Sequence, residues 1–207
     1  MEEKAISVGK VERMLDWAYE GALDGLPGMD SAYEMADNFL SKHDSTDKAI
    51  DSLIRWQNTK AVTSGFLTGL GGIITLPVAI PANIASVMYV QIRMIAAIAH
   101  MKGHDLKDDQ VKTFVFVCLT GQSASGILRK TGIQAGNSFA KQAIKKIPGE
   151  AIKAINKRVG FRLVTKFGEK GVVNLGKAIP IAGGLIGGTV DGVGTNIVGK
   201  TAKKVFV

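Results

Sequence analysis

Apolar residues recur every three or four positions along most of the chain, and they seldom alternate with polar residues in steps of two. The first spacing is typical of one face of an α-helix, and the second of a β-strand. In the first 60 residues the pattern predicts three helices. Their apolar faces are Val11, Leu15, Ala18 and Ala22; Ala32, Ala36, Phe39 and Leu40; and Ala49, Ile50, Leu53 and Ile54.

The N-terminal part of the chain is acidic. Residues 1–51 hold 12 acidic and 5 basic residues, a net charge of −7. Asp30 or Ser31 is placed to cap the second helix, and Ser45 or Thr46 to begin the third, because short polar side chains accept hydrogen bonds from the free N–H groups of a helix N-terminus. The pattern thus predicts an acidic helical lead-in over residues 1–60.

Two charge-free runs follow the lead-in. No Asp, Glu, Lys or Arg occurs from Ala61 to Ile92, and a run of 16 uncharged residues begins after Lys112. We expect residues 61–128 to form an apolar helical hairpin. Its long helix is predicted from about Leu76 to about Lys102.

Glycine and proline set the limits of that long helix. A bend is expected at the glycines within 69–72. Pro77 and Pro81 fall in or beside the first turn, where a missing N–H costs little. Gly103 suits the position just past the C-terminus of the helix.

The apolar run is close to the length of a membrane-spanning helix, which needs about 20 residues. Residues 73–92 nevertheless include two prolines, Asn83 and Gln91, and Arg93 follows directly. An arginine at the bilayer centre costs about 2.5–3.5 kcal/mol on insertion scales. The sequence therefore favours a buried central hairpin over a stable spanning helix, although the two states are not wholly exclusive.

The C-terminal third is basic. Residues 129–207 hold 15 basic and 3 acidic residues, a net charge of +12 in a chain of net charge +8. Apolar residues recur at helical spacing between Ile144 and Val159, interrupted at Pro148-Gly149, with cations on much of the remaining surface. This is the pattern of basic amphipathic helices. The cations expected to meet an anionic surface are Lys141, Lys145, Lys146, Lys153, Lys157, Arg158 and Arg162.

The uneven charge leaves two interpretations open. The basic part attracts the acidic lead-in within the molecule, or it faces an anionic partner. Both follow from the same counts of charged residues, so the sequence alone does not choose between them.

The last segment is apolar and rich in glycine. Gly184, Gly188 and Gly192 repeat every four residues, a spacing that lets two helix backbones approach closely. From Gly194 to Thr201 the chain also matches G-x-x-x-x-G-K-[ST], the phosphate-binding P-loop pattern. A P-loop needs a preceding strand and a surrounding sheet, and no strand pattern precedes this match, so we expect a coincidence.

Together these segments predict an all-α fold in a single domain over residues 1–207. We expect a multi-helix bundle in which the central apolar, Gly/Pro-rich hairpin of residues 61–128 is wrapped by amphipathic helices. The wrapping helices are the acidic lead-in and, over residues 129–207, basic amphipathic helices followed by a Gly-rich C-terminal helix.

Two candidate nucleophiles are better explained by packing. The stretch TGQSASG at 120–126 resembles a nucleophile elbow, but the glycine two places after Ser123 is missing and no strand pattern precedes it. Cys118 lies in an apolar run, which predicts a buried and inert thiol. The acidic N-terminus lacks the pattern of a secretory signal peptide, so secretion is not expected.

One pair of histidines has the spacing of a metal site. His100 and His104 are four residues apart, which suits metal binding on a continuous helix. Because Gly103 is expected to break that helix, a solvated helix end is predicted here instead of a metal site.

Three polar residues fall in apolar surroundings. Gln91 and Arg93 belong to the long apolar helix, and Asp191 interrupts the glycine-rich segment. A buried arginine needs a partner, and acids are scarce in the basic part. We predict a contact between Arg93 and Asp191; the alternative is that both side chains reach water at opposite edges of the bundle.

Two long blocks resemble the EcsC family. They are GFLTGLGGIITLPVAIPANIASVMYVQIRMIAAIAHMKGHDL and IPIAGGLIGGTVDGVGTNIVGKTAKKVF, and the resemblance covers about residues 55–206. The positions that look family-like are Pro77, Pro81, Gln91, Arg93, Gly184 and Asp191. The family is named after a bacterial operon that also encodes an ABC transporter. The resemblance implies no catalytic activity, cofactor or ligand.

The sequence favours a non-enzymatic protein at the cytoplasmic face of the cell membrane, with no cofactor and no metal. Cations near an anionic lipid surface contribute about 1 kcal/mol each, and the hairpin and glycine strip offer a segment to insert or a groove for a lipid tail. The alternative is a soluble adaptor that binds an acidic protein, such as part of a transporter. Nucleic acid is disfavoured, because the basic stretch has few aromatic residues and no known binding signature.

Overall fold

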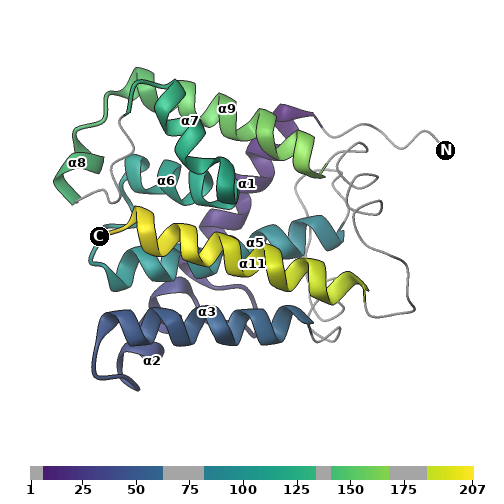
Figure 1. Cartoon of the computed structure of the whole chain (residues 1–207), viewed down its shortest axis with the longest axis vertical. Coiled ribbons are helices and arrows are strands. Elements are labelled where there is room, and N and C mark those ends of the chain that lie inside the picture. Colours follow the sequence, from purple (N-terminus) through teal and green to yellow (C-terminus); the bar gives the residue numbers. More distant parts are fainter. Residues whose placement is uncertain (1–6, 63–81, 134–140, 168–185) are drawn as a thin grey trace.

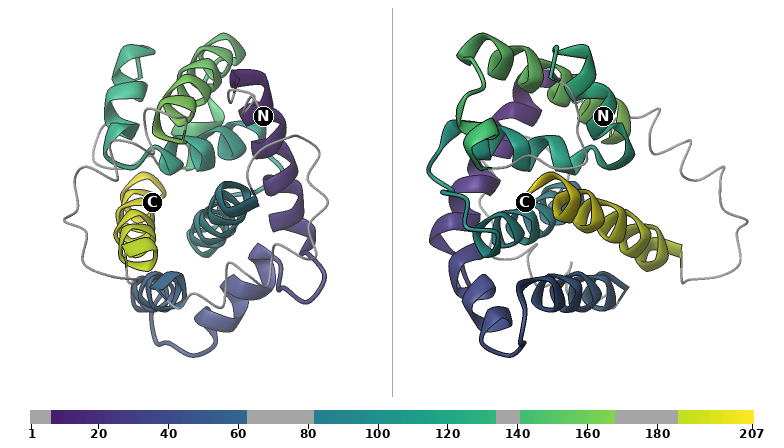
Figure 2. Two further views of the ribbon diagram at one scale, coloured as in Figure 1. Left: turned by 90° about the vertical axis from the view of Figure 1, so that its right-hand side faces the viewer. Right: turned by 60° about the vertical axis from the view of Figure 1, so that its left-hand side comes forward.

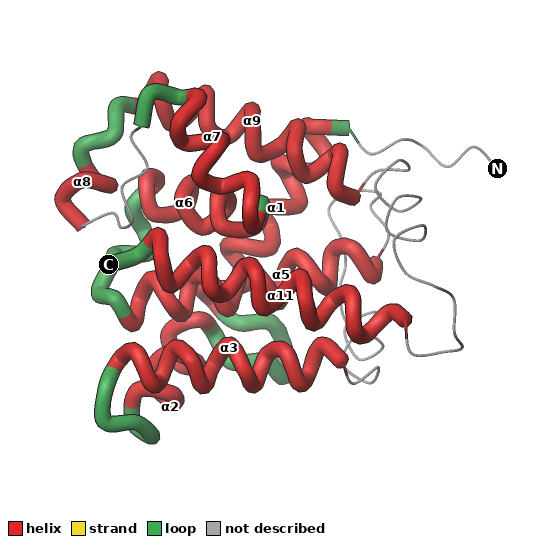
Figure 3. Tube along the Cα trace, in the orientation of Figure 1, coloured by secondary structure: helices red, strands yellow, loops and turns green. Residues whose placement is uncertain are grey.

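The computed structural model describes residues 7–62, 82–133, 141–167 and 186–207 (Figure 1). These residues form nine α-helices and one short 3-10 helix, and none of them lies in a β-strand (Figure 3). The prediction of an all-α helical bundle is confirmed.

The acidic lead-in folds into the three predicted helices. They are α1 (Val8–Asp24), α2 (Ala32–Leu40) and α3 (Thr46–Val62). Ser31 caps α2 through a capping box: its Oγ accepts from Glu34 N at 3.2 Å, and its own N–H donates to Glu34 Oε2 at 2.8 Å. Local polar residues therefore fix where the second helix begins, as the sequence predicts.

Helix α5 (Ala82–Met101) lies at the centre of the molecule. In the left view of Figure 2 it is seen nearly end-on, with the other helices around it. It packs against α1, α2, α3, α6 and α11, and every residue from Met88 to Ala99 is buried. The helix ends as predicted, because Gly103 adopts a left-handed φ of 76° just beyond it. The expected bend at 69–72, Pro77 and Pro81 lie outside the described residues.

The second arm of the hairpin is α6 (Asp109–Leu119), which packs against α5. The uncharged run does not continue as one helix, because the chain turns through a 3-10 helix at Gly121–Ser123 before α7 (Ala124–Lys130). Gly121 has a φ of 59°, and a Cβ there would lie 3.1 Å from Ile197 Cγ2 of α11. The break therefore occurs where α11 crosses this arm.

The basic third forms α8 (Lys141–Lys145), α9 (Gly149–Phe167) and α11 (Ile186–Val205). The interruption predicted at Pro148-Gly149 separates α8 from α9. Helix α9 packs on α1, α6 and α7, at the opposite side of the molecule from α3 (Figure 1). Helix α11 packs along α3 and α5.

The glycine-rich end of the chain is helical over the whole P-loop match. Residues 194–201 lie inside α11, so their backbone belongs to a helix and not to a phosphate-binding loop. The close helix approach occurs at Gly199, where a Cβ would lie 2.8 Å from Ile54 Cγ1 of α3. Gly184 lies outside the described residues, and the surroundings of Gly188 and Gly192 are likewise not described.

A polar contact joins the two central helices. Gln91 of α5 and Thr195 of α11 are 3% and 2% exposed, and Gln91 Nε2 donates to Thr195 Oγ1 at 3.3 Å. Within the described part of the chain Gln91 Oε1 has no hydrogen-bond partner. A buried, unpaired polar atom costs about 1–3 kcal/mol, so this contact specifies the register of the two helices at some expense of stability.

We expect Gly199→Ala to destabilise the fold by about 1–2 kcal/mol, because the added methyl group has no space against Ile54 and overpacking outweighs the gain in helix propensity. Gly194→Ala in the same helix is the control. A Cβ there would have Gln91 Nε2 as its nearest neighbour, at 3.9 Å, so this variant should gain about 0.5–1 kcal/mol. Urea unfolding measures both, and equal stabilisation of the two variants would contradict the close contact.

We expect Gln91→Met combined with Thr195→Val to be as stable as the wild type or up to about 2 kcal/mol more stable, because both polar partners are replaced by apolar groups of similar shape. Thr195→Val alone should lose about 1–3 kcal/mol, since it leaves the Gln91 amide without an acceptor. A double-mutant cycle from chemical unfolding gives the comparison. A double variant less stable than Thr195→Val would show that the pair is a net source of stability.

Candidate functional site

The outer side of α9 carries a row of cations. Ile155, Val159 and Leu163 are completely buried, and their spacing of four residues fixes which side of α9 faces the bundle. The opposite side is exposed, and so are the last residues before α9. We use the name basic face for the exposed cations Lys146, Lys153, Lys157, Arg158 and Arg162.

Most of the basic face has no acidic partner. In the described part of the chain no carboxylate lies within 4.0 Å of Lys146, Lys153, Lys157 or Arg158. Arg162 Nε donates to Ser123 Oγ at 3.0 Å. Four predicted cations therefore point to solvent without a counter-charge.

Two further cations of the prediction stand apart from the basic face. Lys145 Nζ lies 3.2 Å from Asp108 Oδ2, so it is engaged within the protein. The side chain of Lys141 lies outside the described residues, although its backbone begins α8.

The acidic lead-in is paired with other parts of the molecule. Asp16 accepts from Lys112 of α6 at 2.7 Å, and Asp51 from Lys203 of α11 at 2.7 Å. Lys102, just after α5, reaches Asp47 at 2.9 Å. The first interpretation of the uneven charge therefore holds for Lys203, which meets the lead-in. An external anionic partner for the basic face stays a prediction.

An aromatic residue lies among these cations. Phe161 of α9 is 69% exposed. It follows Lys157 and Arg158 by four and three residues, so it shares their side of the helix. In the sequence analysis Phe161 counts only as one of few aromatic residues in the basic stretch. The four-residue spacing of Ile155, Val159 and Leu163 is the sequence signal that places Phe161 on the opposite, outer side of the helix.

Arg93 is buried in the bundle and finds a backbone partner. It is 3% exposed, and Nη1 donates to the Asp30 carbonyl at 2.9 Å. Its guanidinium also lies 5.6 Å from the centroid of the Tyr89 ring. Burial lowers the pKa of Arg93 from its ordinary value, yet arginine keeps its charge in proteins. The side chain of Asp191 lies outside the described residues, so the Arg93–Asp191 contact stays a prediction.

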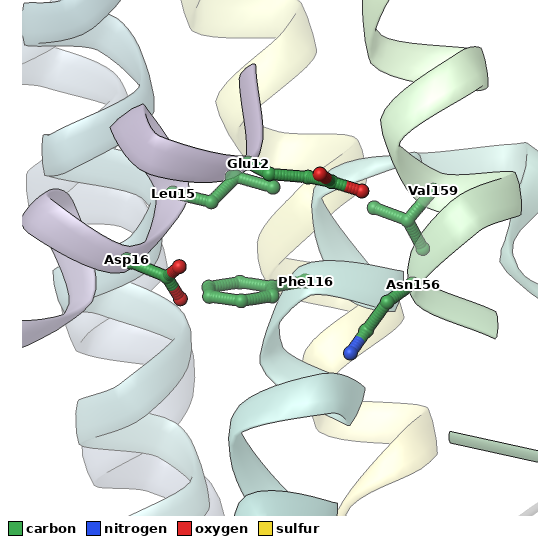
Figure 4. A pocket seen from close by; sticks show the side chains of 6 residues that line it. All are labelled: Glu12, Leu15, Asp16, Phe116, Asn156 and Val159. Carbon is green, nitrogen blue, oxygen red and sulfur yellow. The ribbon is translucent and has the colours of Figure 1, made fainter. Parts of the chain in front are cut away.

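A small cavity lies on the inner side of α9. It has a volume of about 210 Å³ between α1, α6 and α9 (Figure 4), below the roughly 300–1,000 Å³ of typical ligand pockets. Its lining is Glu12, Leu15, Asp16, Phe116, Asn156 and Val159. Asp16 is already paired with Lys112, and Glu12 and Asn156 are the other polar residues of the lining.

The two histidines are separated by the helix end. His100 Nε2 lies 3.9 Å from Asp37 Oδ1, and its ring packs edge-on against Tyr33. His104 is 4% exposed and packs against Phe206, so the prediction of a solvated helix end is wrong for His104. The C-terminal end of the chain covers it. In the described ranges no three His, Cys, Asp or Glu side chains are grouped to hold a metal ion.

The two candidate nucleophiles are occupied or buried. Ser123 accepts the hydrogen bond from Arg162 and lies in the short 3-10 helix. Cys118 is completely buried, and burial raises the pKa of its thiol. Since a thiolate is the reactive form, Cys118 is an inert core residue, as predicted.

The central helix also meets the length and composition of a membrane span. Within the described residues, Ile84–Met101 is the segment that does so, and 83% of it is buried inside the protein. The core helix of a soluble bundle satisfies the same criteria. The described part of the apolar run, from Ile84 onward, lies in the core of the bundle, which is the arrangement that the sequence favours.

Comparison with known proteins identifies one family. The model of the EcsC protein family matches residues 22–207. No curated protein and no solved structure matches the chain. The match begins within α1 and includes the central helix, the basic face and the glycine-rich C-terminal helix. The chain therefore belongs to the EcsC family.

Proposed function

We propose that this protein is a non-enzymatic, peripheral membrane protein that binds anionic lipid through its basic face. The observation that carries the proposal is the basic face, in which four exposed cations on and just before α9 lack a carboxylate partner in the described part of the chain. We place the protein at the cytoplasmic side of the cell membrane, where anionic lipids create a negative surface potential. The proposed binding requires no cofactor.

The number of cations supports a useful affinity. A Lys or Arg near an anionic leaflet contributes about 1 kcal/mol, so the five cations of the basic face together supply a few kcal/mol. Residues 141–167 contain eight basic residues and one acidic residue, Glu150. Because exposed charges are screened over about 10 Å at 0.1 M salt, this binding should weaken as the salt concentration rises.

The alternative is a soluble adaptor whose basic face binds an acidic protein, such as part of a transporter. The burial of the central helix favours it, since the hairpin is used inside the bundle and is not presented to a lipid. The two proposals share the same cations and differ in the partner. A lipid vesicle without any protein separates them.

We expect Lys153→Gln, Lys157→Gln and Arg158→Gln together to reduce binding to anionic vesicles about 100-fold, because three attractions of about 1 kcal/mol are lost. The measurement is co-flotation with vesicles of phosphatidylglycerol and phosphatidylcholine, against phosphatidylcholine alone, at low and high salt. The wild type should float only with the anionic vesicles and should be released by salt.

The matched control removes the same charge elsewhere. Lys42, Lys48 and Arg55 are exposed on the α2–α3 side, away from α9 (Figure 1), and Lys42→Gln, Lys48→Gln and Arg55→Gln together should keep most of the binding. Equal losses in both triple variants would point to net charge and overturn the assignment to α9. A wild type that ignores all vesicles would remove the lipid proposal and favour the adaptor.

A further inference from the structure

Phe161 is exposed where a large apolar side chain is normally buried. At 69% exposure it is one of two large hydrophobic residues exposed in the described part of the chain, and Val207 at 51% is the other. Phenylalanine gains free energy on leaving water, so burying this ring against another phase or molecule would be favourable.

The packing of α9 holds the ring outward. Ile155, Val159 and Leu163 fill the inner side of the helix completely. Gly160, the residue before Phe161, is buried in close contact with α1, since a Cβ at this position would lie 3.0 Å from Val8 Cγ1. Turning Phe161 into the bundle would require α9 to roll and break these contacts. The exposure of the ring is therefore a property of the fold.

Cations flank the ring mainly on the N-terminal side of α9. Lys157 and Arg158 precede Phe161 by four and three residues, and Arg162 follows it directly. Helical side chains lean toward the N-terminus, so the ring lies over the turn that carries Lys157 and Arg158. One turn further along α9, the Thr165 hydroxyl donates a hydrogen bond to the Phe161 carbonyl oxygen at 2.9 Å. The helix continues through this turn without a break.

An apolar ring flanked by long cationic side chains fits a lipid bilayer. A bilayer presents phosphates at its surface and hydrocarbon beneath, and Lys and Arg side chains can reach up to the phosphates while an aromatic ring enters below them. Aromatic residues are enriched at this depth in membrane proteins. The basic face supplies the complementary charge for an anionic surface.

We propose that Phe161 is the membrane anchor of this protein: its ring inserts below the phosphates of an anionic bilayer, and α9 lies along the membrane surface with its cations on the lipid phosphates. This inference rests on the proposed function, because the basic face first has to bring α9 to the membrane. The occupant of the surface is the bilayer, and the central hairpin stays in the bundle.

The first test compares Phe161→Ala with Val207→Ala on vesicles of phosphatidylglycerol and phosphatidylcholine. Phe161→Ala should lower the partition coefficient roughly 3- to 10-fold, because apolar surface is no longer buried on binding. Apolar burial is not screened by salt, so the loss should have the same factor at low and at moderate salt. Val207→Ala, which removes a similarly exposed apolar side chain away from α9, should bind as the wild type does.

The second test places a reporter at the same position. Phe161→Trp should show blue-shifted emission and quenching by lipids brominated on their acyl chains, measured against the wild type, whose Trp17 and Trp56 are partly buried in the core. Thermal unfolding of both Phe161 variants should match the wild type, since the side chain is exposed. Insertion is thus separated from any loss of folding.

The outcomes separate this inference from the proposed function. If the wild type binds anionic vesicles and loses binding in the α9 charge variant, but Phe161→Ala binds unchanged and Phe161→Trp is not quenched, then Phe161 is not an anchor and the surface binding stands. If the wild type binds no vesicles at all, both proposals fall together.

Discussion

The burial of helix α5 from Met88 to Ala99 is the constraint on which the rest of the structure depends. Its residues from Met88 to Ala99 are buried on every side, so the neighbouring helices have to approach closely all around it. Glycine lets these neighbours also approach one another: Gly199 lets α11 lie against Ile54 of α3, and Gly121 lets the second arm of the hairpin turn where α11 crosses. The polar groups of α5 then need partners from the same neighbours.

The position of α9 follows from this arrangement. The helices around α5 pack their apolar faces on it, and α9 packs mainly on two of those helices, α1 and α6. The buried side of α9 is a narrow apolar stripe of Ile155, Val159 and Leu163, and this stripe packs on the bundle. The rest of its circumference is left to solvent. A helix in this outer layer can therefore carry many cations and an exposed ring without burying any charge.

The sequence predicts the features that depend on local signals. The capping box of Ser31, the end of α5 at Gly103 and the break before α9 are each decided within a few residues, and each is where the pattern places it. Features that depend on distant contacts were not predictable. His104 is buried because Phe206 covers it, and Gly121 ends a helix at the crossing of α11. Neither neighbour is near in sequence.

The candidate site shows the same division. The cations of α9 are visible in the sequence, but whether they are paired depends on where the acidic lead-in folds, and its carboxylates reach Lys102, Lys112 and Lys203 instead. For Arg93 the sequence suggests a charged partner, and the structure supplies the Asp30 carbonyl. Every residue has a backbone carbonyl, so the types of residues in the sequence do not predict which carbonyl accepts from Arg93.

The proposed membrane binding does not require the bundle to open. To release α5 into a bilayer, the protein would have to break the Arg93 bond to the Asp30 carbonyl and the ion pair between Lys102 and Asp47, and move a charged arginine into hydrocarbon. The basic face and Phe161 are already at the surface of the folded protein and need no such change. Because the folded state presents both the charge and the apolar group, the proposed surface attachment through α9 costs less free energy than the release of α5.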